Sequence, residues 1–144
     1  GYIAGEKALV HHLRISAPGF LYSVGMSPPL AAASSASLKV MLAEPERVQQ
    51  LQNNGRFFLE LCKKHQIDTG YSAGLAVVPA ILGSSARAGL VANRMFDRGI
   101  NVQPIFYPAV EEGMARLRFF ISSSHTAEQI QYTVETLAEV MAKK

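Results

Sequence analysis

Two arginines placed two positions apart are the side chains of this sequence best suited to binding chemistry. Arg116 and Arg118 lie in the segment ARLRFF, which otherwise has the composition of a buried β-strand. Because alternate side chains of a strand share a face, we expect both guanidinium groups on one face and Leu117 and Phe119 on the other. A guanidinium binds a carboxylate through two parallel N–H···O bonds. The pair therefore indicates a carboxylate clamp; the alternative is a solvent-exposed sheet face that binds nothing.

The segments around this strand predict a small α+β domain over residues 46–144. Hydrophobic periodicity and turn residues predict helices at 46–66, 86–98 and 127–142 and strands at 75–83, 100–108 and 115–122. The last helix follows a capping box of Thr126 and Gln129. We expect a three-stranded, mostly antiparallel sheet with the helices on one face.

Residues 1–45 fit this domain poorly. We expect them to form a helical arm that packs against another domain or subunit. Their pattern predicts the end of a buried strand at 1–5, a helix at 6–15, and a helix from Pro29 to Glu44 that is rich in alanine and serine. Small side chains of this kind allow another backbone to approach closely. The apolar start GYIAG, without a methionine or a polar leader, suggests a segment of a longer protein.

The composition argues against several classes of function. The net charge is only +3 and the basic residues are scattered, which gives no footprint for nucleic acid. No apolar run approaches the roughly 20 residues of a membrane-spanning helix. Cys62 is the single cysteine, so the chain forms no internal disulfide and is compatible with a reducing compartment.

Several familiar catalytic and metal-binding motifs are absent from the sequence. There is no GxGxxG, P-loop or HExxH segment. His11 and His12 are adjacent and diverge on a helix, whereas His65 and His125 are isolated, so we expect no metal site. Cys62 lies on an apolar helical stripe, which is typical of a buried, inert thiol. The arginine pair and the hydroxyl-rich loop at 22–27 remain as candidates.

Three segments, taken together, resemble the α-oxoamine synthases. GYIAG, FLYSVGMSPPLAAASSASLKVM and RGINVQPIFYPAVEEGMARLRFFISSSHTAEQI occur in this order. They are similar to the C-terminal third of this family of pyridoxal-phosphate (PLP) enzymes, which includes 8-amino-7-oxononanoate synthase and serine palmitoyltransferase. The resemblance covers essentially the whole chain and is most specific between Arg98 and Thr126. The SVGMSPP loop is most similar to members associated with polyketide synthases.

The resemblance implies the C-terminal fragment of a cytoplasmic, homodimeric acyltransferase. Such an enzyme condenses an amino acid with an acyl-CoA or acyl-carrier-protein thioester and releases CO₂, giving an α-amino ketone. The family's Schiff-base lysine would lie just upstream of residue 1, so this chain would hold no catalytic residue. Residues 1–45 would derive from the end of the large PLP domain and the interdomain helix. By itself the fragment would be inactive and would bind PLP weakly or not at all.

The resemblance also assigns binding roles to individual residues. Arg118 matches the family's arginine for the substrate carboxylate, whereas the role of Arg116 stays open. Ser23 matches the hydroxyl that reaches the PLP phosphate of the neighbouring subunit. Gly25 and an extra residue before the prolines depart from the family pattern, so a second hydroxyl contact is either lost or moved to Ser27. His125 is expected to cap or orient the last helix.

Two other interpretations of the sequence remain. A fold-type I aminotransferase shares the domain and its carboxylate-binding arginine, although the segments YPAVEEG and ARLRFFISSSHT favour the synthase. A non-catalytic α+β binding or assembly module is compatible with the missing lysine.

Overall fold

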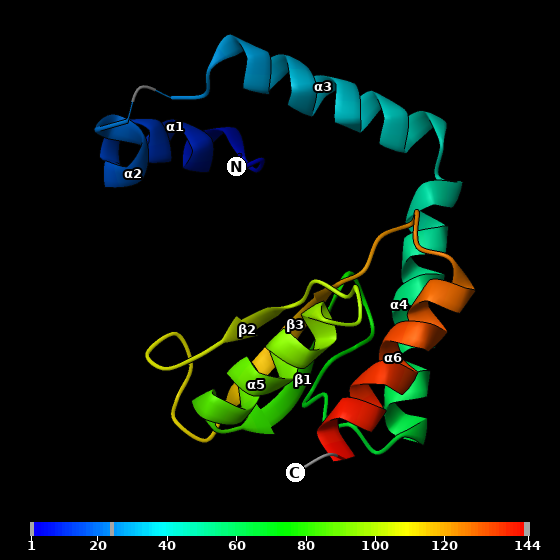
Figure 1. Cartoon of the computed structure of the whole chain (residues 1–144). Coiled ribbons are helices and arrows are strands. Elements are labelled where there is room, and N and C mark those ends of the chain that lie inside the picture. Colours follow the sequence, from blue (N-terminus) through cyan, green and yellow to red (C-terminus); the bar gives the residue numbers. More distant parts are fainter. Residues whose placement is uncertain (1, 24, 143–144) are drawn as a thin grey trace. The chain divides into compact units, whose positions relative to one another are not determined.

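The computed structural model describes residues 2–23 and 25–142, which form two compact units, Gly1–Ala43 and Glu44–Lys144. The described residues contain six helices and three strands (Figure 1). In chain order these are α1 (Lys7–Ser16), α2 (Pro18–Leu21), α3 (Pro28–Ala43), α4 (Glu46–Lys64), β1 (Val77–Gly83), α5 (Ser85–Phe96), β2 (Gln103–Ile105), β3 (Ala115–Phe120) and α6 (Ala127–Ala142). Within the described residues, none of these helices combines the length and the apolar character needed to cross a membrane.

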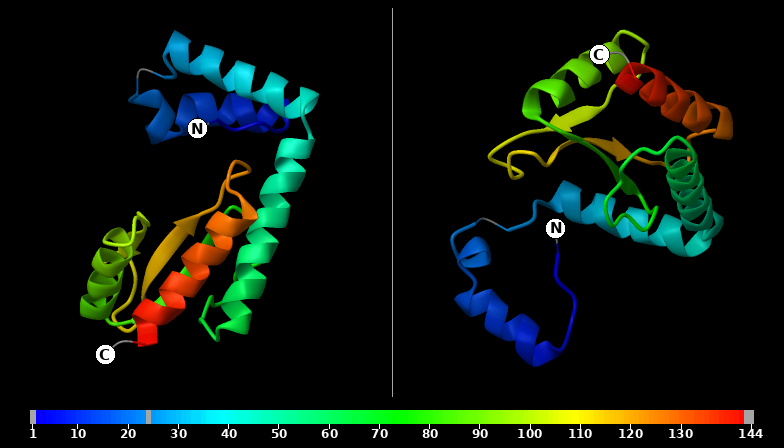
Figure 2. Two further views of the ribbon diagram at one scale, coloured as in Figure 1. Left: turned by 45° about the vertical axis from the view of Figure 1, so that its right-hand side comes forward. Right: turned by 90° about the horizontal axis from the view of Figure 1, so that it is seen from below.

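The second unit is the α+β domain that the sequence predicts. Its antiparallel sheet has the strand order β1-β3-β2, with β3 in the centre. Helix α5 packs against all three strands, and α6 packs between α5 and α4. Figure 2 shows these helices gathered along one side of the sheet. Within the described residues of this unit, no helix covers the opposite face of the sheet.

The core of the second unit lies between the sheet and its helices. The rings of Phe58 on α4 and Phe119 on β3 meet at its centre, with centroids 5.0 Å apart. The predicted apolar stripe of α6 faces this core, because Ile130, Val134 and Leu137 are buried. The capping box that begins α6 is confirmed: Thr126 and Gln129 each donate a backbone N–H to the other's side chain, at 3.0 and 3.3 Å.

The strand predicted at 100–108 is shorter in the structure, where β2 covers only Gln103–Ile105. The N–H of Ile100 donates to the carbonyl of Met95 at 3.0 Å, so Ile100 belongs to the turn that ends α5. Gly99 precedes it with a φ of 79°, which favours glycine. Pro104 has no N–H for a sheet ladder, which is compatible with β2 as an edge strand.

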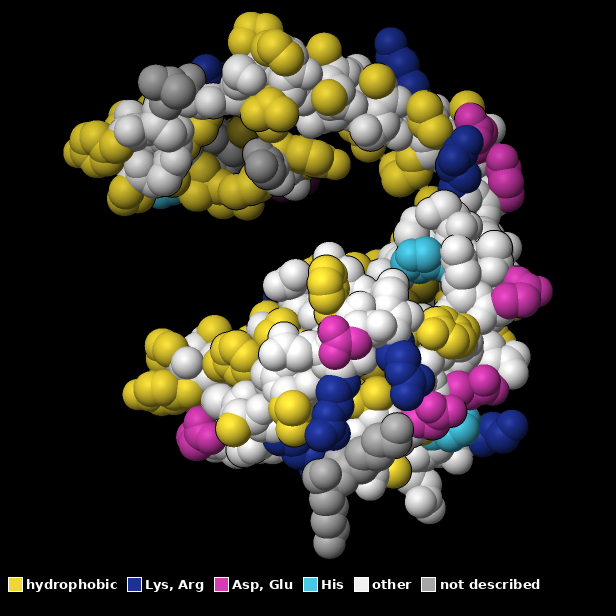
Figure 3. Space-filling model, viewed as in Figure 1, with side chains coloured by type: hydrophobic (Ala, Val, Ile, Leu, Met, Phe, Trp, Pro, Cys, Tyr) yellow, Lys and Arg dark blue, Asp and Glu magenta, His cyan; other side chains and the backbone are white. Residues whose placement is uncertain are grey.

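The first unit contains α1, α2 and α3 and has no interior of its own. None of its described residues is buried, and its apolar side chains reach the surface along all three helices (Figure 3). The strand predicted at 1–5 is wrong for the described residues 2–5, which are irregular and exposed. A strand needs a neighbouring strand to pair its backbone groups, and this unit contains none in its described residues.

A buried asparagine and the glycine that follows it connect α4 to two other segments. Asn54 donates from its Nδ2 to the carbonyls of Ser122 and His125, at 2.9 Å each. Gly55 lies against the chain at 74–75, where an added Cβ would be 2.4 Å from the carbonyl oxygens of Gly74 and Leu75. Glycine is therefore required at this position inside α4 by a close backbone approach.

Candidate substrate-binding site

Strand β3 carries the candidate residues on the face of the sheet that the helices leave open. Ala115, Leu117 and Phe119 are buried, whereas Arg118 and Phe120 are exposed on the other face. This alternation confirms the expected separation of the arginines from Leu117 and Phe119. In the neighbouring strands, Pro79 and Gln103 lie opposite Arg118.

Arg118 presents a guanidinium that is available to a ligand. Its Cζ lies 5.0 Å from the centroid of the Phe120 ring, in cation–π contact. Among the described residues, no side chain or backbone group forms a hydrogen bond or an ion pair with it. The ring supports the flat guanidinium, and all its N–H groups remain free to bind an acceptor such as a carboxylate.

Arg116 differs from Arg118 although both lie on the same face of β3. It is half-buried, and its Nε donates to the carbonyl of Met114 at 3.0 Å. This bond ties the side chain to the start of its own strand. Of the two guanidinium groups, that of Arg118 therefore has more N–H groups available to a ligand.

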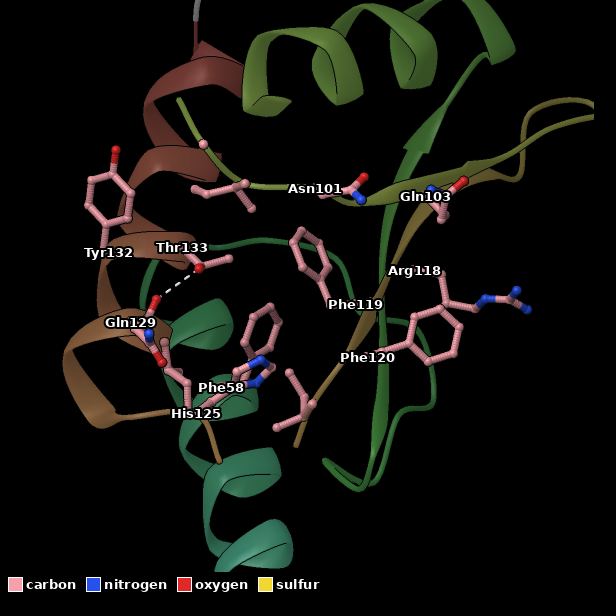
Figure 4. Close-up of a pocket in the computed structure, with 14 residues that line it drawn as sticks. Phe58, Asn101, Gln103, Arg118, Phe119, Phe120, His125, Gln129, Tyr132 and Thr133 are labelled. Carbon is pink, nitrogen blue, oxygen red and sulfur yellow. Dashed lines mark hydrogen bonds between the residues drawn. The ribbon is translucent and has the colours of Figure 1, made fainter. Parts of the chain in front are cut away.

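A pocket of about 470 Å³ adjoins Arg118 at the end of the sheet (Figure 4). Side chains from α4, the segment before β2, β3 and α6 surround it. Its lining consists of Phe58, Gly99, Ile100, Asn101, Gln103, Arg118, Phe119, Phe120, Ile121, His125, Gln129, Ile130, Tyr132 and Thr133. In Figure 4, Arg118 points away from His125 and Gln129, so its guanidinium lies at the outer rim.

His125 forms part of the pocket wall and orients the loop before α6. Its Nδ1 accepts a hydrogen bond from the backbone N–H of Ser122 at 3.1 Å. The side-chain oxygen of the buried Asn54 accepts from Gln50, and its NH₂ group donates to the carbonyls of Ser122 and His125 in the same loop. The loop that joins β3 to α6 is therefore fixed from two sides.

The predicted phosphate-binding serines lie in the first unit, in the loop before α3. Ser23 donates from its Oγ to the carbonyl of Phe20 at 3.2 Å and accepts from the N–H of Gly25 at 3.3 Å. The carbonyl of Ser27 accepts from the N–H of Ala31 at 3.0 Å, immediately before α3. Both serines are exposed. They flank one loop, whereas Arg118 belongs to the other unit.

The structure also shows the surroundings of the possible metal ligands and of the single cysteine in the part of the chain that it describes. Within these residues, no three His, Cys, Asp or Glu side chains are close enough together to hold a metal ion. Cys62 is fully buried in the core, as its position on an apolar stripe predicts.

We expect Cys62 to be inert toward thiol reagents in the folded chain. Burial raises the pKa of its thiol to about 12, and the reactive species is the thiolate. At pH 8, alkylation by iodoacetamide should be about 1000-fold slower than in the unfolded chain. Mass spectrometry of timed samples, with and without urea, measures the ratio. Equal rates in the two samples would contradict the buried position.

Sequence reasoning missed most of the pocket. Strand alternation from Arg118 could have identified Phe120 as its neighbour on the same face. The polar residues Asn101 and Gln103 gave no signal, because isolated amides in a short edge segment are common. Their grouping with residues of α6 follows from the tertiary fold alone.

Comparison with known proteins supports the resemblance over nearly the whole chain. The family model "Aminotransferase class I and II" matches residues 1–137. The chain is 36% identical over 143 residues to 8-amino-7-oxononanoate synthase of Thermosipho melanesiensis, covering 99% of this chain and 36% of that protein. It is 33% identical over 146 residues to human serine palmitoyltransferase 3, covering 97% of this chain and 26% of that protein. The chain thus spans 36% and 26% of the length of these two relatives, in their C-terminal part.

Solved structures share the fold. A high-resolution structure of SPT with PLP internal aldimine matches with a TM-score of 0.81 at 20% identity, over 95% of this chain and 35% of that one. An 8-amino-7-oxononanoate synthase from Francisella tularensis matches with a TM-score of 0.76 at 24% identity, over 94% of this chain and 39% of that one. The fold predicted from the sequence is confirmed, and the chain belongs to the aminotransferase class I and II family.

Proposed function

We propose that this chain is the C-terminal part of a PLP-dependent acyltransferase of the α-oxoamine synthase type. The whole enzyme would condense an amino acid with an acyl thioester and release CO₂, yielding an α-amino ketone. The names of the matched relatives support this class of reaction. The observation that carries the proposal is the guanidinium of Arg118, which lies on the central strand and has no hydrogen-bond or ion-pair partner among the described residues.

Arg118 would bind and orient the amino acid by its carboxylate. The strand fixes the backbone of the arginine, and the Phe120 ring supports its side chain. Both oxygens of a carboxylate can then accept N–H groups of the same guanidinium. A primary amine without a carboxylate would leave this guanidinium without its anion as the site closes, so the site favours amino acids over amines.

The loop before α3 has groups that fit the phosphate of PLP. Ser23 and Ser27 provide hydroxyls next to the N-terminus of a helix of 16 residues, and helix N-termini favour phosphate. The Ser23 Oγ forms its hydrogen bonds with nearby backbone groups on an exposed loop. A ligand can replace these partners by forming its own hydrogen bonds with the hydroxyl. When bound, PLP supplies the electron sink for a carbanion at the substrate Cα. We propose that the Schiff-base lysine for PLP belongs to the part of the enzyme that precedes this chain. We also propose that the loop before α3 binds the PLP phosphate of the neighbouring subunit in a cytoplasmic homodimer.

The full-length enzyme offers a direct test of the reaction. Candidate amino acids are incubated with PLP and an acyl thioester, and the release of CO₂ and of free thiol is followed in the same sample. Equal amounts of both products, dependent on the amino acid, are expected. Transfer of the amino group to a 2-oxo acid without CO₂ would identify an aminotransferase, and no reaction with any substrate would favour the non-catalytic module.

A further inference from the structure

Phe120 is a large aromatic side chain that lies exposed on the central strand. It follows Arg118 on the open face of β3 and is 56% exposed. The core of the unit uses the preceding residue, Phe119, which is 5% exposed and whose ring meets that of Phe58. Packing within the second unit therefore does not account for an aromatic side chain at position 120, and its role has to be sought on the open face.

On that face the ring of Phe120 is in contact with the guanidinium of Arg118. The Cζ of Arg118 lies 5.0 Å from the ring centroid, within the roughly 6 Å that a cation–π contact allows. In Figure 4 the ring lies beside the arginine side chain. The residues paired with Arg118 and Phe120 in the neighbouring strands are Val77, Pro79 and Gln103, and none of them carries a charge. The ring therefore provides what these neighbours cannot, an electrostatic partner for the cation.

Two other arginines of this unit are held by oxygen atoms instead. Arg98 forms an ion pair with Glu139 at 3.4 Å, and Arg87 donates to the carbonyl of Met141 at 3.3 Å. An oxygen acceptor occupies N–H groups of the guanidinium, and a carboxylate also neutralises its charge. An aromatic face attracts a cation without neutralising it and without an oxygen that competes with a ligand. A ring is therefore suited to hold an arginine that has to remain able to bind a carboxylate.

We propose that Phe120 is a positioning residue, whose ring holds the guanidinium of Arg118 in the orientation that receives the carboxylate of the amino acid. This inference rests on the substrate binding proposed above for Arg118. An arginine side chain has many rotamers, and the entropy lost when a ligand selects one of them weakens binding. The ring restricts these rotamers before the amino acid binds. Phe120 thus raises the affinity for the amino acid through Arg118, and it does not affect the affinity for the acyl donor.

Steady-state kinetics of the full-length enzyme test this role. Phe120→Leu keeps an apolar side chain but removes the ring, and the KM for the amino acid should rise about three- to tenfold. Phe120→Tyr keeps the ring and should give a KM within about twofold of the parent enzyme. The KM for the thioester should stay unchanged in both variants. The matched control is Phe96→Leu on α5, because Phe96 is 66% exposed and does not line the pocket. It should leave both KM values unchanged.

A double-mutant cycle with Arg118→Met determines whether the ring acts through the arginine. The measured quantity is kcat/KM for the amino acid in the parent enzyme, the two single variants and the double variant. Phe120→Leu should lower it about three- to tenfold when Arg118 is present, and less than about twofold when methionine replaces the arginine. An equal loss in both backgrounds would overturn the proposal, because the ring would then act without the guanidinium. A parent-like KM for Phe120→Leu, or a loss that Phe120→Tyr shares, would overturn it as well.

The contact itself can be measured without the reaction. In the NMR spectrum of the ¹⁵N-labelled 144-residue chain at mildly acidic pH, Phe120→Leu should move the side-chain Nε–H signal of Arg118, whereas Phe96→Leu should leave it in place. A signal that Phe120→Leu does not move would contradict the contact. The two proposals therefore fail separately. An enzyme that releases no CO₂ can still show the ring-dependent signal, and an active acyltransferase without this signal removes only the role of Phe120.

Discussion

Replacement of Arg118 by lysine in the full-length enzyme is expected to raise the KM for the amino acid by roughly 10- to 100-fold. A lysine keeps the charge but offers a compact ammonium in place of the planar fork, so two parallel bonds to one carboxylate are lost. It also loses the flat stacking on Phe120, where the arginine Cζ lies 5.0 Å from the ring centroid. The KM for the thioester should change much less, because the substituted group does not hold the donor's reacting end.

Arg116→Lys is the matched control for this experiment. Arg116 is on the same face of the same strand, but its Nε is engaged with the carbonyl of Met114. Steady-state rates at varied amino acid and saturating thioester should give a KM within about twofold of the parent enzyme, as for most surface substitutions. If Arg118→Lys leaves both KM and kcat unchanged, the guanidinium does not hold the substrate and the proposed reaction loses its main structural support.

Gly55→Ala is expected to destabilise the second unit by about 3 kcal/mol or more, because the new methyl group has no space. Its Cβ would lie 2.4 Å from two backbone oxygens, at Gly74 and Leu75. Alanine is favoured over glycine inside a helix by about 1 kcal/mol, and this gain is too small to offset the clash. Relief would require α4 and the 74–75 segment to separate, and both are backbone rather than flexible side chains.

Urea unfolding followed by circular dichroism measures this loss, and Gly89→Ala is its control. Gly89 is also inside a helix, but a Cβ there would meet only the Phe106 ring, at 3.6 Å, an ordinary contact. We expect Gly89→Ala to be neutral or to stabilise the unit by up to about 1 kcal/mol. If Gly55→Ala and the parent chain unfold at the same urea concentration, the close approach of α4 to the 74–75 segment does not limit stability.

Local patterns predicted those features that depend on local physics. The capping box before α6 and the apolar stripe of that helix require only residues within a few turns, and both are confirmed. Strand alternation correctly placed Arg118 on the face opposite Leu117, since the period of a strand is fixed by its backbone. The helix at 6–15 was likewise predicted within one residue at each end.

Features that depend on distant contacts could not be predicted in this way. The need for glycine at position 55 inside α4 comes from a segment some twenty positions further along the chain. Strand spacing alone does not distinguish the two arginines, whereas the bond of Arg116 to Met114 and the contact of Arg118 with Phe120 do. The strand expected at 1–5 is missing from the described residues, because an apolar sequence forms a strand only where a partner strand is present.

The lack of buried side chains among the described residues of the first unit has a consequence for chaperone binding and for calorimetry. Among the described residues, every buried apolar side chain belongs to the second unit, from Phe58 to Val140. Apolar groups such as Phe20 and Tyr22 would stay accessible to chaperones after the second unit has collapsed. Because the heat-capacity increment of unfolding follows the apolar surface that becomes hydrated, nearly all of it should come from Glu44–Lys144. The melting of this chain by itself is therefore the melting of its second unit.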